Sequence, residues 1–209
     1  MDLTNPQRVA KLAGHLFHHP GNFPRYVAHN LIARKPPVEL ELPWFSYAAI
    51  DFLEKYLRPE TRVFEFGSGG STLFFAQRVK SVSTVEDNAH WCDIVAAKIS
   101  ACRIKNVDLL HVPVEFVTDQ VFAGSEYLQA VRQSSFDVIV VDGTEWTPTA
   151  RPICFHAAEE QIAPGGIIVV DDSWRYRELR QANRARRLET FEGVGPARFG
   201  VTSTDVYFY

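Results

Sequence analysis

The segment 62–72 constrains the fold of this chain more than any other. It begins with an apolar run typical of a buried strand, and because the run stops at glycines we expect the strand to end in a tight turn. Ser71 or Thr72 can cap a helix that begins near Leu73. A strand, a glycine turn and a helix N-terminus together aim backbone N–H groups at a ligand, although such a turn can also be a plain connection.

The carboxylate of Glu65 indicates which ligand such a turn would bind. It stands two residues before Gly67, where it would repel a pyrophosphate but could accept hydrogen bonds from an ammonium group. The dinucleotide fingerprint Gly-x-Gly-x-x-Gly is not matched, because Thr72 stands three residues after Gly69. The glycines allow positive φ angles and a close approach to the backbone. We expect the ligand to be bound by Glu65, Gly67, Ser68, Gly69, Ser71 and Thr72.

The overall composition favours one globular domain with an adequate core. The chain has 209 residues, of which 46% are hydrophobic and 22% charged, with a formal net charge of −3. This balance indicates neither disorder nor strong attraction to nucleic acid. No apolar run approaches the roughly 18 residues of a membrane span and no secretory signal is visible, so we expect a cytoplasmic protein without a membrane partner. Three widely spaced cysteines predict neither disulfides nor a zinc site.

The first 42 residues differ from the rest of the chain. Residues 4–17 have helical spacing of apolar side chains, and residues 23–41 contain three prolines and predict an irregular connector. We therefore divide the chain into an N-terminal arm, residues 1–42, and a main domain, residues 43–209. The arm could act as a lid, contact the substrate, or form a homodimer through its exposed aromatic side chains.

The main domain alternates strands and helices. Strands are expected at 81–85, 107–112, 136–143 and 167–170, with helices at 43–57, 73–79, 90–102, 125–133 and 152–162. Glu86 ends the second strand, where an acid can accept the hydroxyl protons of a ribose, and Asp87 extends the same loop. Asp142 emerges at the end of the most apolar strand, beside the glycine turn.

The last 35 residues predict a helix and a hairpin. In the segment 175–188 the arginines recur at helical spacing, which indicates a polar helix that is mostly solvated. Residues 199–202 and 206–209 are expected to pair as strands of a terminal β-hairpin, joined by a turn at 203–205. The hairpin matters because a dinucleotide-binding domain would normally continue with another parallel unit.

The spacing Glu65-x-Gly67-x-Gly69-x-Ser71 resembles the first signature of class I S-adenosylmethionine-dependent methyltransferases, with serine where the third glycine commonly stands. The segments 136–143 and 163–172 also resemble the family's fourth- and fifth-strand signatures. The resemblance implies an α/β, Rossmann-like fold with a mostly parallel seven-stranded sheet, helices on both faces and a C-terminal antiparallel hairpin. It also implies S-adenosylmethionine as cofactor, with an acid after the third strand, Glu115 or Asp119, reading the adenine.

A narrower resemblance concerns Asp142, Asp171 and Asp172, which end adjacent strands. Their layout is similar to the metal ligands of cation-dependent O-methyltransferases, and three carboxylates could bind Mg²⁺. Asp172 replaces the family's asparagine, and Glu145 stands where those enzymes carry a lysine. A metal-free alternative is that Asp142 or Asp171 serves as the catalytic base.

These observations favour O-methylation of a small hydroxylated molecule or sugar, with no nucleic acid as partner. Two alternatives remain open from the sequence. The first is an NAD(P)-dependent oxidoreductase, which the glycine turn and Glu86 also suit. The second is a non-catalytic methyltransferase-like protein that binds an anionic partner through the arginine-rich segment 175–188.

Overall fold

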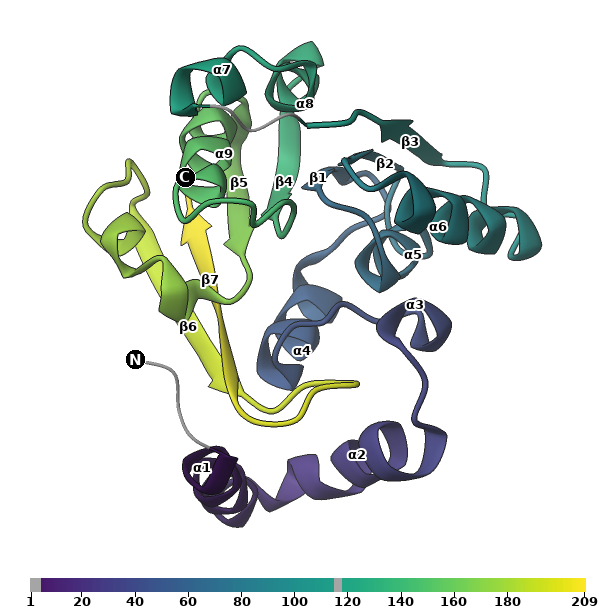
Figure 1. The fold of residues 1–209 in the computed structure, drawn as a ribbon, viewed down its shortest axis with the longest axis vertical. Helices are drawn as coiled ribbons and strands as arrows, with labels where there is room; N and C mark the ends of the chain where they lie inside the picture. Colours follow the sequence, from purple (N-terminus) through teal and green to yellow (C-terminus); the bar gives the residue numbers. More distant parts are fainter. Residues whose placement is uncertain (1–4, 115–117) are drawn as a thin grey trace.

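A seven-stranded sheet forms the centre of the molecule, with the strand order β3-β2-β1-β4-β5-β7-β6 (Figure 1). The computed structural model describes residues 5–114 and 118–209. Strands β1 to β5 pair in parallel, and β7 is antiparallel to both of its neighbours. This sheet confirms the predicted Rossmann-like fold. The strands are β1 Arg62–Phe66, β2 Ser81–Glu86, β3 Val107–His111, β4 Phe136–Val141, β5 Ile162–Val170, β6 Arg187–Gly193 and β7 Thr202–Phe208.

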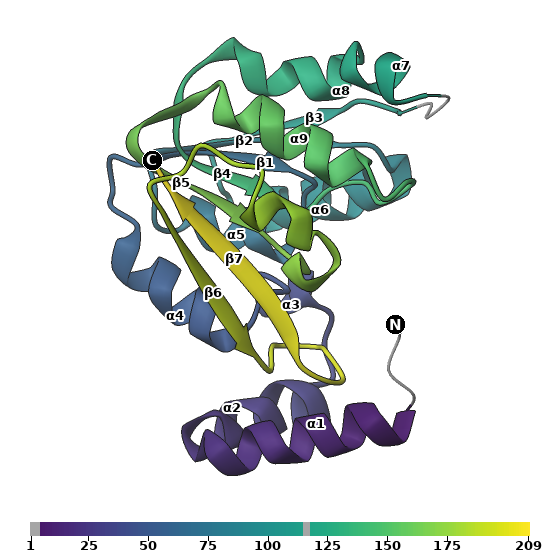
Figure 2. The ribbon, with the colours of Figure 1, turned by 90° about the vertical axis from the view of Figure 1, so that its left-hand side faces the viewer.

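Helices cover both faces of the sheet (Figure 2). Val138 and Val140 of β4 pack against α4 and α5, whereas Ile139 and Val141 pack on the side of α8 and α9. Burial on both faces explains why this strand is apolar without alternation. No helix in the described ranges combines the length and hydrophobicity needed to cross a membrane. The helices of the main domain are α4 Tyr47–Tyr56, α5 Gly70–Ala76, α6 Ala89–Ala101, α7 Asp119–Ala123, α8 Glu126–Gln129, η3 Ala130–Gln133 and α9 Ala150–Glu159.

The N-terminal arm is more helical than the prolines predicted. The expected irregular connector, residues 23–41, contains two short α-helices and a π-helix. Pro24 and Pro37 stand in the first turns of α2 and α3, where their missing N–H groups cost no helical hydrogen bond. The arm lies across the lower end of the β6–β7 hairpin (Figure 2). Its elements are α1 Asn5–His18, η1 Pro20–Asn22, α2 Phe23–Val27, η2 Ala28–Ala33 and α3 Pro37–Leu40.

The C-terminal hairpin exists, but the predicted boundaries were wrong. The segment expected as one polar helix forms two short 3₁₀ helices, η4 Ser173–Arg175 and η5 Arg177–Arg180, followed by strand β6. The expected turn at 203–205 lies inside β7, and the two strands are joined instead by residues 194–201, here called the β6–β7 loop. The arginines 177, 180, 184 and 187 therefore do not share one helix face.

Buried polar pairs explain why residues 203–205, predicted as a turn, belong to strand β7. Ser203, Thr204 and Asp205 are all buried, and each has a partner. Thr204 Oγ1 donates to Asp171 Oδ1 at 2.9 Å, and the Ser203 and Ser173 hydroxyl oxygens lie 2.8 Å apart. Asp205 accepts hydrogen bonds from Ser173 and from Arg180. Because these partners satisfy the side chains, polar residues occupy a central strand position at tolerable cost.

Replacing Arg180 by Met should lower the free energy of unfolding by about 3 kcal/mol, because it leaves the fully buried Asp205 carboxylate without its cation. Urea unfolding followed by circular dichroism would measure the change. Arg184→Met is the matched control, since the Arg184 side chain is exposed and lies 3.9 Å from its nearest acid, Glu159. Equal stability of Arg180→Met and the control would contradict the role assigned to the Arg180–Asp205 pair.

Candidate active site

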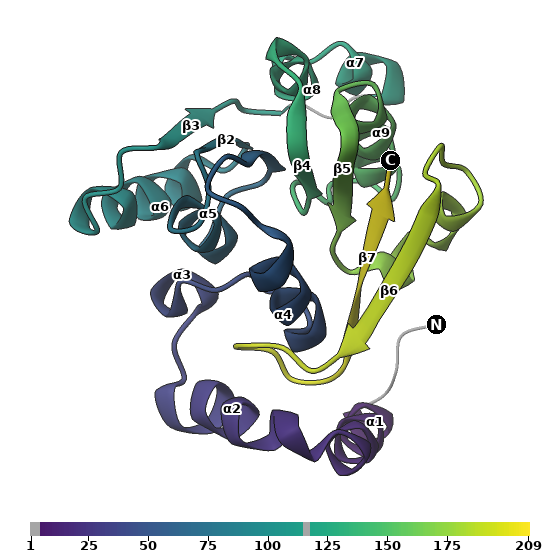
Figure 3. The same ribbon diagram turned by 180° about the vertical axis from the view of Figure 1, so that it is seen from behind.

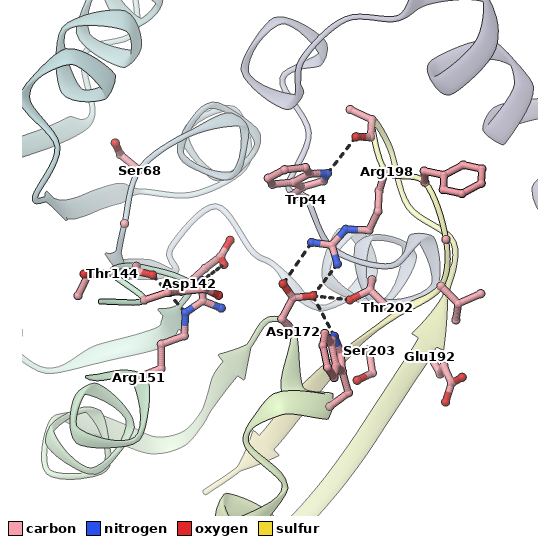
Figure 4. A pocket seen from close by; sticks show the side chains of 18 of the residues that line it. Trp44, Ser68, Asp142, Thr144, Arg151, Asp172, Glu192, Arg198, Thr202 and Ser203 are labelled. Atoms are coloured by element: carbon pink, nitrogen blue, oxygen red, sulfur yellow. Dashed lines mark hydrogen bonds and ion pairs between the residues drawn. The ribbon is translucent and has the colours of Figure 1, made fainter. Parts of the chain in front are cut away.

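A cleft of about 1050 Å³ opens at the carboxyl ends of the parallel strands. It lies where the strand order reverses between β1 and β4, the position at which open α/β sheets bind ligands. Residues that follow β1, β2 and β4 line one side of the cleft. Residues that follow β5, together with β6, β7, the β6–β7 loop and α1, line the other side. Figure 4 shows the two sides facing each other.

The glycine turn after β1 is held against the end of β4. Gly67 has a φ of 90°, and a Cβ at this position would lie 2.8 Å from the Asp142 carbonyl oxygen and the Gly143 Cα. No other residue fits there without moving the backbone of β4. Thr72 Oγ1 accepts the N–H of Gly69 at 3.0 Å and so caps α5. The predicted turn is present, but the predicted helix start was wrong: α5 begins at Gly70 with Gly69 as its N-cap, so Ser71 and Thr72 lie in its first turn.

Glu86 joins the ends of β1 and β2. Its Oε2 accepts hydrogen bonds from the backbone N–H of Ser68 at 2.9 Å and from the Ser68 hydroxyl at 2.8 Å, while Oε1 accepts from Asn88 N at 3.0 Å. These bonds fix the carboxylate at the cleft wall. The adjacent Asp87 accepts a hydrogen bond from the indole of Trp146, an exposed side chain on the loop after β4. Both acids therefore lie on the lining of the cleft, at the end of β2.

Glu65 lies beneath the turn and is fully buried. Neither of its carboxylate oxygens has a hydrogen bond of good geometry to a described residue, although Ser71 and Thr72 are close enough to favour the charged form. Burial raises the pKa of Glu65 to about 8. An acid of this kind is largely protonated at neutral pH in the free protein, and a cation nearby would ionise it.

The sequence-predicted residues separate into two layers. Those on the cleft lining are Gly67, Ser68, Glu86, Asp87, Asp142 and Asp172; those behind the lining are Glu65, Gly69, Ser71, Thr72 and Asp171. For the adenine, Glu115 falls outside the described residues. Asp119 accepts a hydrogen bond from Thr149 and does not line the cleft.

Arg151, which was not predicted from the sequence, forms ion pairs with the carboxylates of Asp142 and Glu145 that follow β4. Its side chain is buried, and Nη2 lies 3.1 Å from Asp142 Oδ1 and 2.9 Å from Glu145 Oε1. Its other nitrogens donate to the carbonyl oxygens of Gly143 and Asp171. Burial raises the pKa of Asp142 above its usual range, and the charge of Arg151 opposes part of that shift. Asp142 remains partly exposed to the cleft.

Arg198, on the β6–β7 loop, binds the acids that follow β5. Its Nη1 lies 2.5 Å from Asp172 Oδ1, which also accepts the Thr202 hydroxyl at 2.7 Å (Figure 4). Burial opposes ionisation of Asp172, but Arg198 and Thr202 outweigh it and lower the pKa of this carboxyl. Burial raises the pKa of Asp171, and the carboxylates of Asp142 and Asp172 add to the shift.

The predicted Mg²⁺ ligands do not fit a metal in this arrangement. Arg151 contacts Asp142, and Arg198 contacts Asp172 and lies 3.6 Å from Asp171. Guanidinium groups thus stand where a cation would have to bind, and Asp171 is turned toward Thr204 under the lining. Within residues 5–114 and 118–209, no three His, Cys, Asp or Glu side chains are grouped as metal ligands. We therefore derive no catalytic step from a metal.

The N-terminal arm lies beside the β6–β7 loop (Figure 3), and hydrogen bonds join the two. Asn30 accepts the backbone N–H of Arg198 at 2.7 Å and donates to the carbonyl oxygen of Gly195, and the Tyr26 hydroxyl donates to the Arg198 carbonyl oxygen. Trp44, which precedes α4, donates its indole N–H to the Ala197 carbonyl oxygen. The position of Arg198 therefore depends on residues far from the sheet in sequence.

The sequence profile of a methyltransferase domain family matches residues 64–173, which is more than half of the chain. The matched range begins in the glycine-turn strand and ends just after Asp172. The chain belongs to this methyltransferase family. It is an S-adenosylmethionine-dependent methyltransferase, and we do not retain the oxidoreductase and non-catalytic alternatives.

Solved structures of other methyltransferases share the fold of this methyltransferase. A protein from Klebsiella pneumoniae proposed to be an O-methyltransferase has a TM-score of 0.63 at 17% identity, over 96% of this chain and 98% of that chain. The O-methyltransferase from Bacillus cereus, solved with SAH, has a TM-score of 0.61 at 18% identity, over 88% and 95%. An rRNA methylase from Streptococcus thermophilus has a TM-score of 0.57 at 13% identity, over 83% and 97%. No curated protein sequence matches this methyltransferase.

Replacing Glu65 by Gln should change how the stability of the free protein depends on pH. Between the ordinary glutamate pKa and about 8, the native state holds one proton more than the unfolded state, so the free energy of unfolding falls as pH rises. The difference in unfolding free energy between Glu65→Gln and the unmodified protein should therefore grow by up to about 1.4 kcal/mol per pH unit between pH 5 and 8.

Urea unfolding at a series of pH values would measure this difference. Glu60→Gln, at an exposed position before β1, serves as control and should give a curve parallel to that of the unmodified protein. A parallel curve for Glu65→Gln as well would show that the Glu65 carboxyl titrates near its ordinary pKa.

Proposed function

We propose that this methyltransferase methylates a hydroxyl oxygen of a small hydroxylated molecule or sugar, with Asp142 as the catalytic base and without a divalent cation. One observation carries the proposal: Asp142 faces the cleft beside the glycine turn, while arginine side chains occupy the positions a metal would need.

The residues on the β1 and β2 side suit S-adenosylmethionine. The turn leaves backbone exposed where a side chain would clash, Thr144 Oγ1 is buried without a hydrogen-bond partner among the described residues, and the lining carries Glu86 and Asp87. We assign the ribose to Glu86 and the edge of the adenine pocket to Asp87. Glu65 would supply negative charge beneath the turn for the cationic amino-acid end.

The reaction needs a group that removes the proton of the acceptor hydroxyl. When bound, S-adenosylmethionine would supply an electrophilic methyl group and leave as S-adenosylhomocysteine, so this chain's own residues need only orient the acceptor and take its proton. Asp142 accepts the proton, because its Oδ1 is fixed by Arg151 while the carboxylate stays open to the cleft. A carboxyl whose pKa is raised by burial is a better base near neutral pH than an exposed aspartate.

The likeness to the Bacillus cereus and Klebsiella pneumoniae proteins supports an oxygen acceptor, since both are described as O-methyltransferases, although it shows the fold alone. Asp142 and Arg198 lie on facing sides of the cleft (Figure 4), and we assign the acceptor to the space between them. A cleft of about 1050 Å³ is sized for a cofactor together with a small molecule.

The first test is a calorimetric titration with S-adenosylhomocysteine, once with Mg²⁺ and once with a chelator. We expect the same affinity in both, and a loss of at least about tenfold in Glu86→Ala, because the substitution removes an acceptor of two ribose hydroxyls. Asp119→Asn is the control and should bind normally, since Asp119 does not line the cleft. Binding only in the presence of Mg²⁺ would contradict the metal-free proposal, and absence of binding would contradict the assigned cofactor site.

Replacing Asp142 by Asn should reduce kcat by about 10²–10⁴ while leaving the affinity for S-adenosylhomocysteine nearly unchanged, because general base catalysis contributes this much. Transfer of a labelled methyl group to acceptor, measured under single-turnover conditions, would give the rate. Asp172→Asn provides the comparison at the neighbouring strand end. Full activity of Asp142→Asn would exclude Asp142 as the base.

A further inference from the structure

The charges on the cleft lining are segregated between its two sides. The side formed after β1, β2 and β4 carries four carboxylates, those of Glu86, Asp87, Asp142 and Glu145, and one cation, Arg151. We call this side the acidic half. The opposite side, the basic half, carries five cations and two carboxylates, Asp172 and Glu192; its cations are Arg8, Lys11, Arg177, Arg180 and Arg198.

Pairing does not neutralise the basic half. Lys11 lies 2.8 Å from Glu192, Arg180 pairs with the buried Asp205, and Arg198 pairs with Asp172. Each of these pairs uses one cation and one acid. Arg177 is exposed on the lining and has no ion-pair or hydrogen-bond partner among residues 5–114 and 118–209. An excess of positive charge therefore remains on the side opposite the cofactor residues, where it favours an anion.

Aromatic side chains stand beside these cations. Trp44, Trp174 and Phe199 all line the basic half, with exposed fractions of 48%, 41% and 60%. The guanidinium carbon of Arg198 lies 5.1 Å from the centre of the Trp44 ring, which holds the cation against an aromatic face (Figure 4). Exposed aromatic surface in a cleft suits a flat apolar ligand, which can be stacked while its charged group reaches the arginines.

Arg198 retains hydrogen-bonding capacity despite its pairing. A guanidinium has five N–H donors. Among the described residues, Nη1 lies 2.5 Å from Asp172 Oδ1, whereas Nη2 makes only longer contacts, 3.5 Å to Asp172 Oδ2 and 3.6 Å to Asp171 Oδ2. The terminal N–H groups that these contacts leave unused can bind a carboxylate at the cleft wall.

We propose that the basic half binds an acceptor that is a hydroxylated aromatic carboxylate, with Arg198 and Arg177 binding its carboxylate and Trp44, Trp174 and Phe199 flanking its ring. This inference rests on the proposed function, since it names the acceptor class of the same site. The cleft volume of about 1050 Å³ is in the range of small-molecule sites, so we propose a small anion as the acceptor, not a polyanion such as RNA.

The test compares two matched ligands, 3,4-dihydroxybenzoate and its neutral counterpart 3,4-dihydroxybenzamide. Calorimetry on the full chain saturated with S-adenosylhomocysteine gives their affinities. The acid should bind at least about tenfold more tightly than the amide, because the amide cannot form charge-assisted hydrogen bonds to the arginines. Added salt should weaken binding of the acid and leave the amide unchanged.

Arg177→Gln is the decisive variant, because the Arg177 side chain is exposed and makes no hydrogen bond or ion pair within residues 5–114 and 118–209 that its loss would disturb. This substitution should lower the affinity for 3,4-dihydroxybenzoate about three- to tenfold and leave the affinity for 3,4-dihydroxybenzamide unchanged. Arg198→Lys should also lower the affinity for 3,4-dihydroxybenzoate. A thermal melt would show that this variant is folded. Arg186→Gln, exposed and away from the cleft, is the control and should bind both ligands normally.

Equal affinity for acid and amide, or binding of neither, would overturn the proposed acceptor class. So would tighter binding of a short RNA that competes with the acid. Failure of S-adenosylhomocysteine itself to bind would instead count against the proposed function, so the two failures are distinguishable.

Discussion

The close approach of β1 and β4 at their carboxyl ends determines where everything else in this methyltransferase can lie. A Cβ on Gly67 would meet the backbone of Asp142 and Gly143, and a Cβ on Gly143 would lie 2.9 Å from the carbonyl carbon of Phe66. The two glycines allow the strands to stay paired to their last residues while the chain leaves in opposite directions. The cleft exists because the helices that follow these strands are directed apart, and Asp142 is placed beside the cofactor turn by the same contact.

The glycine-turn side of the cleft could be predicted from sequence because its residues are local to strand ends. Glu65, Gly67 and Glu86 stand at fixed distances from apolar runs, and the parallel topology brings those strand ends to one edge. The spacing of these residues in the sequence could not reveal how deeply each side chain lies below the cleft lining. Glu65 was expected at the ligand, and the structure places it one layer below, because β1 is covered on both faces up to its last residue.

The opposite side of the cleft could not be predicted, because its structure depends on pairs of residues distant in the chain. Arg151 and Arg198 are ordinary arginines in the sequence, and only the fold brings them to Asp142 and Asp172. The middle of strand β7 was predicted wrongly for the same reason. Ser203 and Asp205 are residue types that favour turns, and their buried partners come from η4 and η5. From composition alone, polar residues are predicted to be exposed. In the structure, hydrogen-bond partners offset the free-energy cost of burying them.

The contacts that hold the β6–β7 loop go to its main-chain atoms. Tyr26, Asn30 and Trp44 bind carbonyl oxygens and an N–H group of residues 195–198, and none of these bonds involves a side chain of the loop. Hydrogen bonds to main-chain atoms do not depend on which side chains the loop carries, provided that its backbone conformation is kept. The exposed Phe199 side chain is therefore free to diverge by mutation without loosening the loop, whereas the Arg198 side chain also pairs with Asp172. Substitutions at position 199 can thus change the lining of the cleft on an unchanged frame.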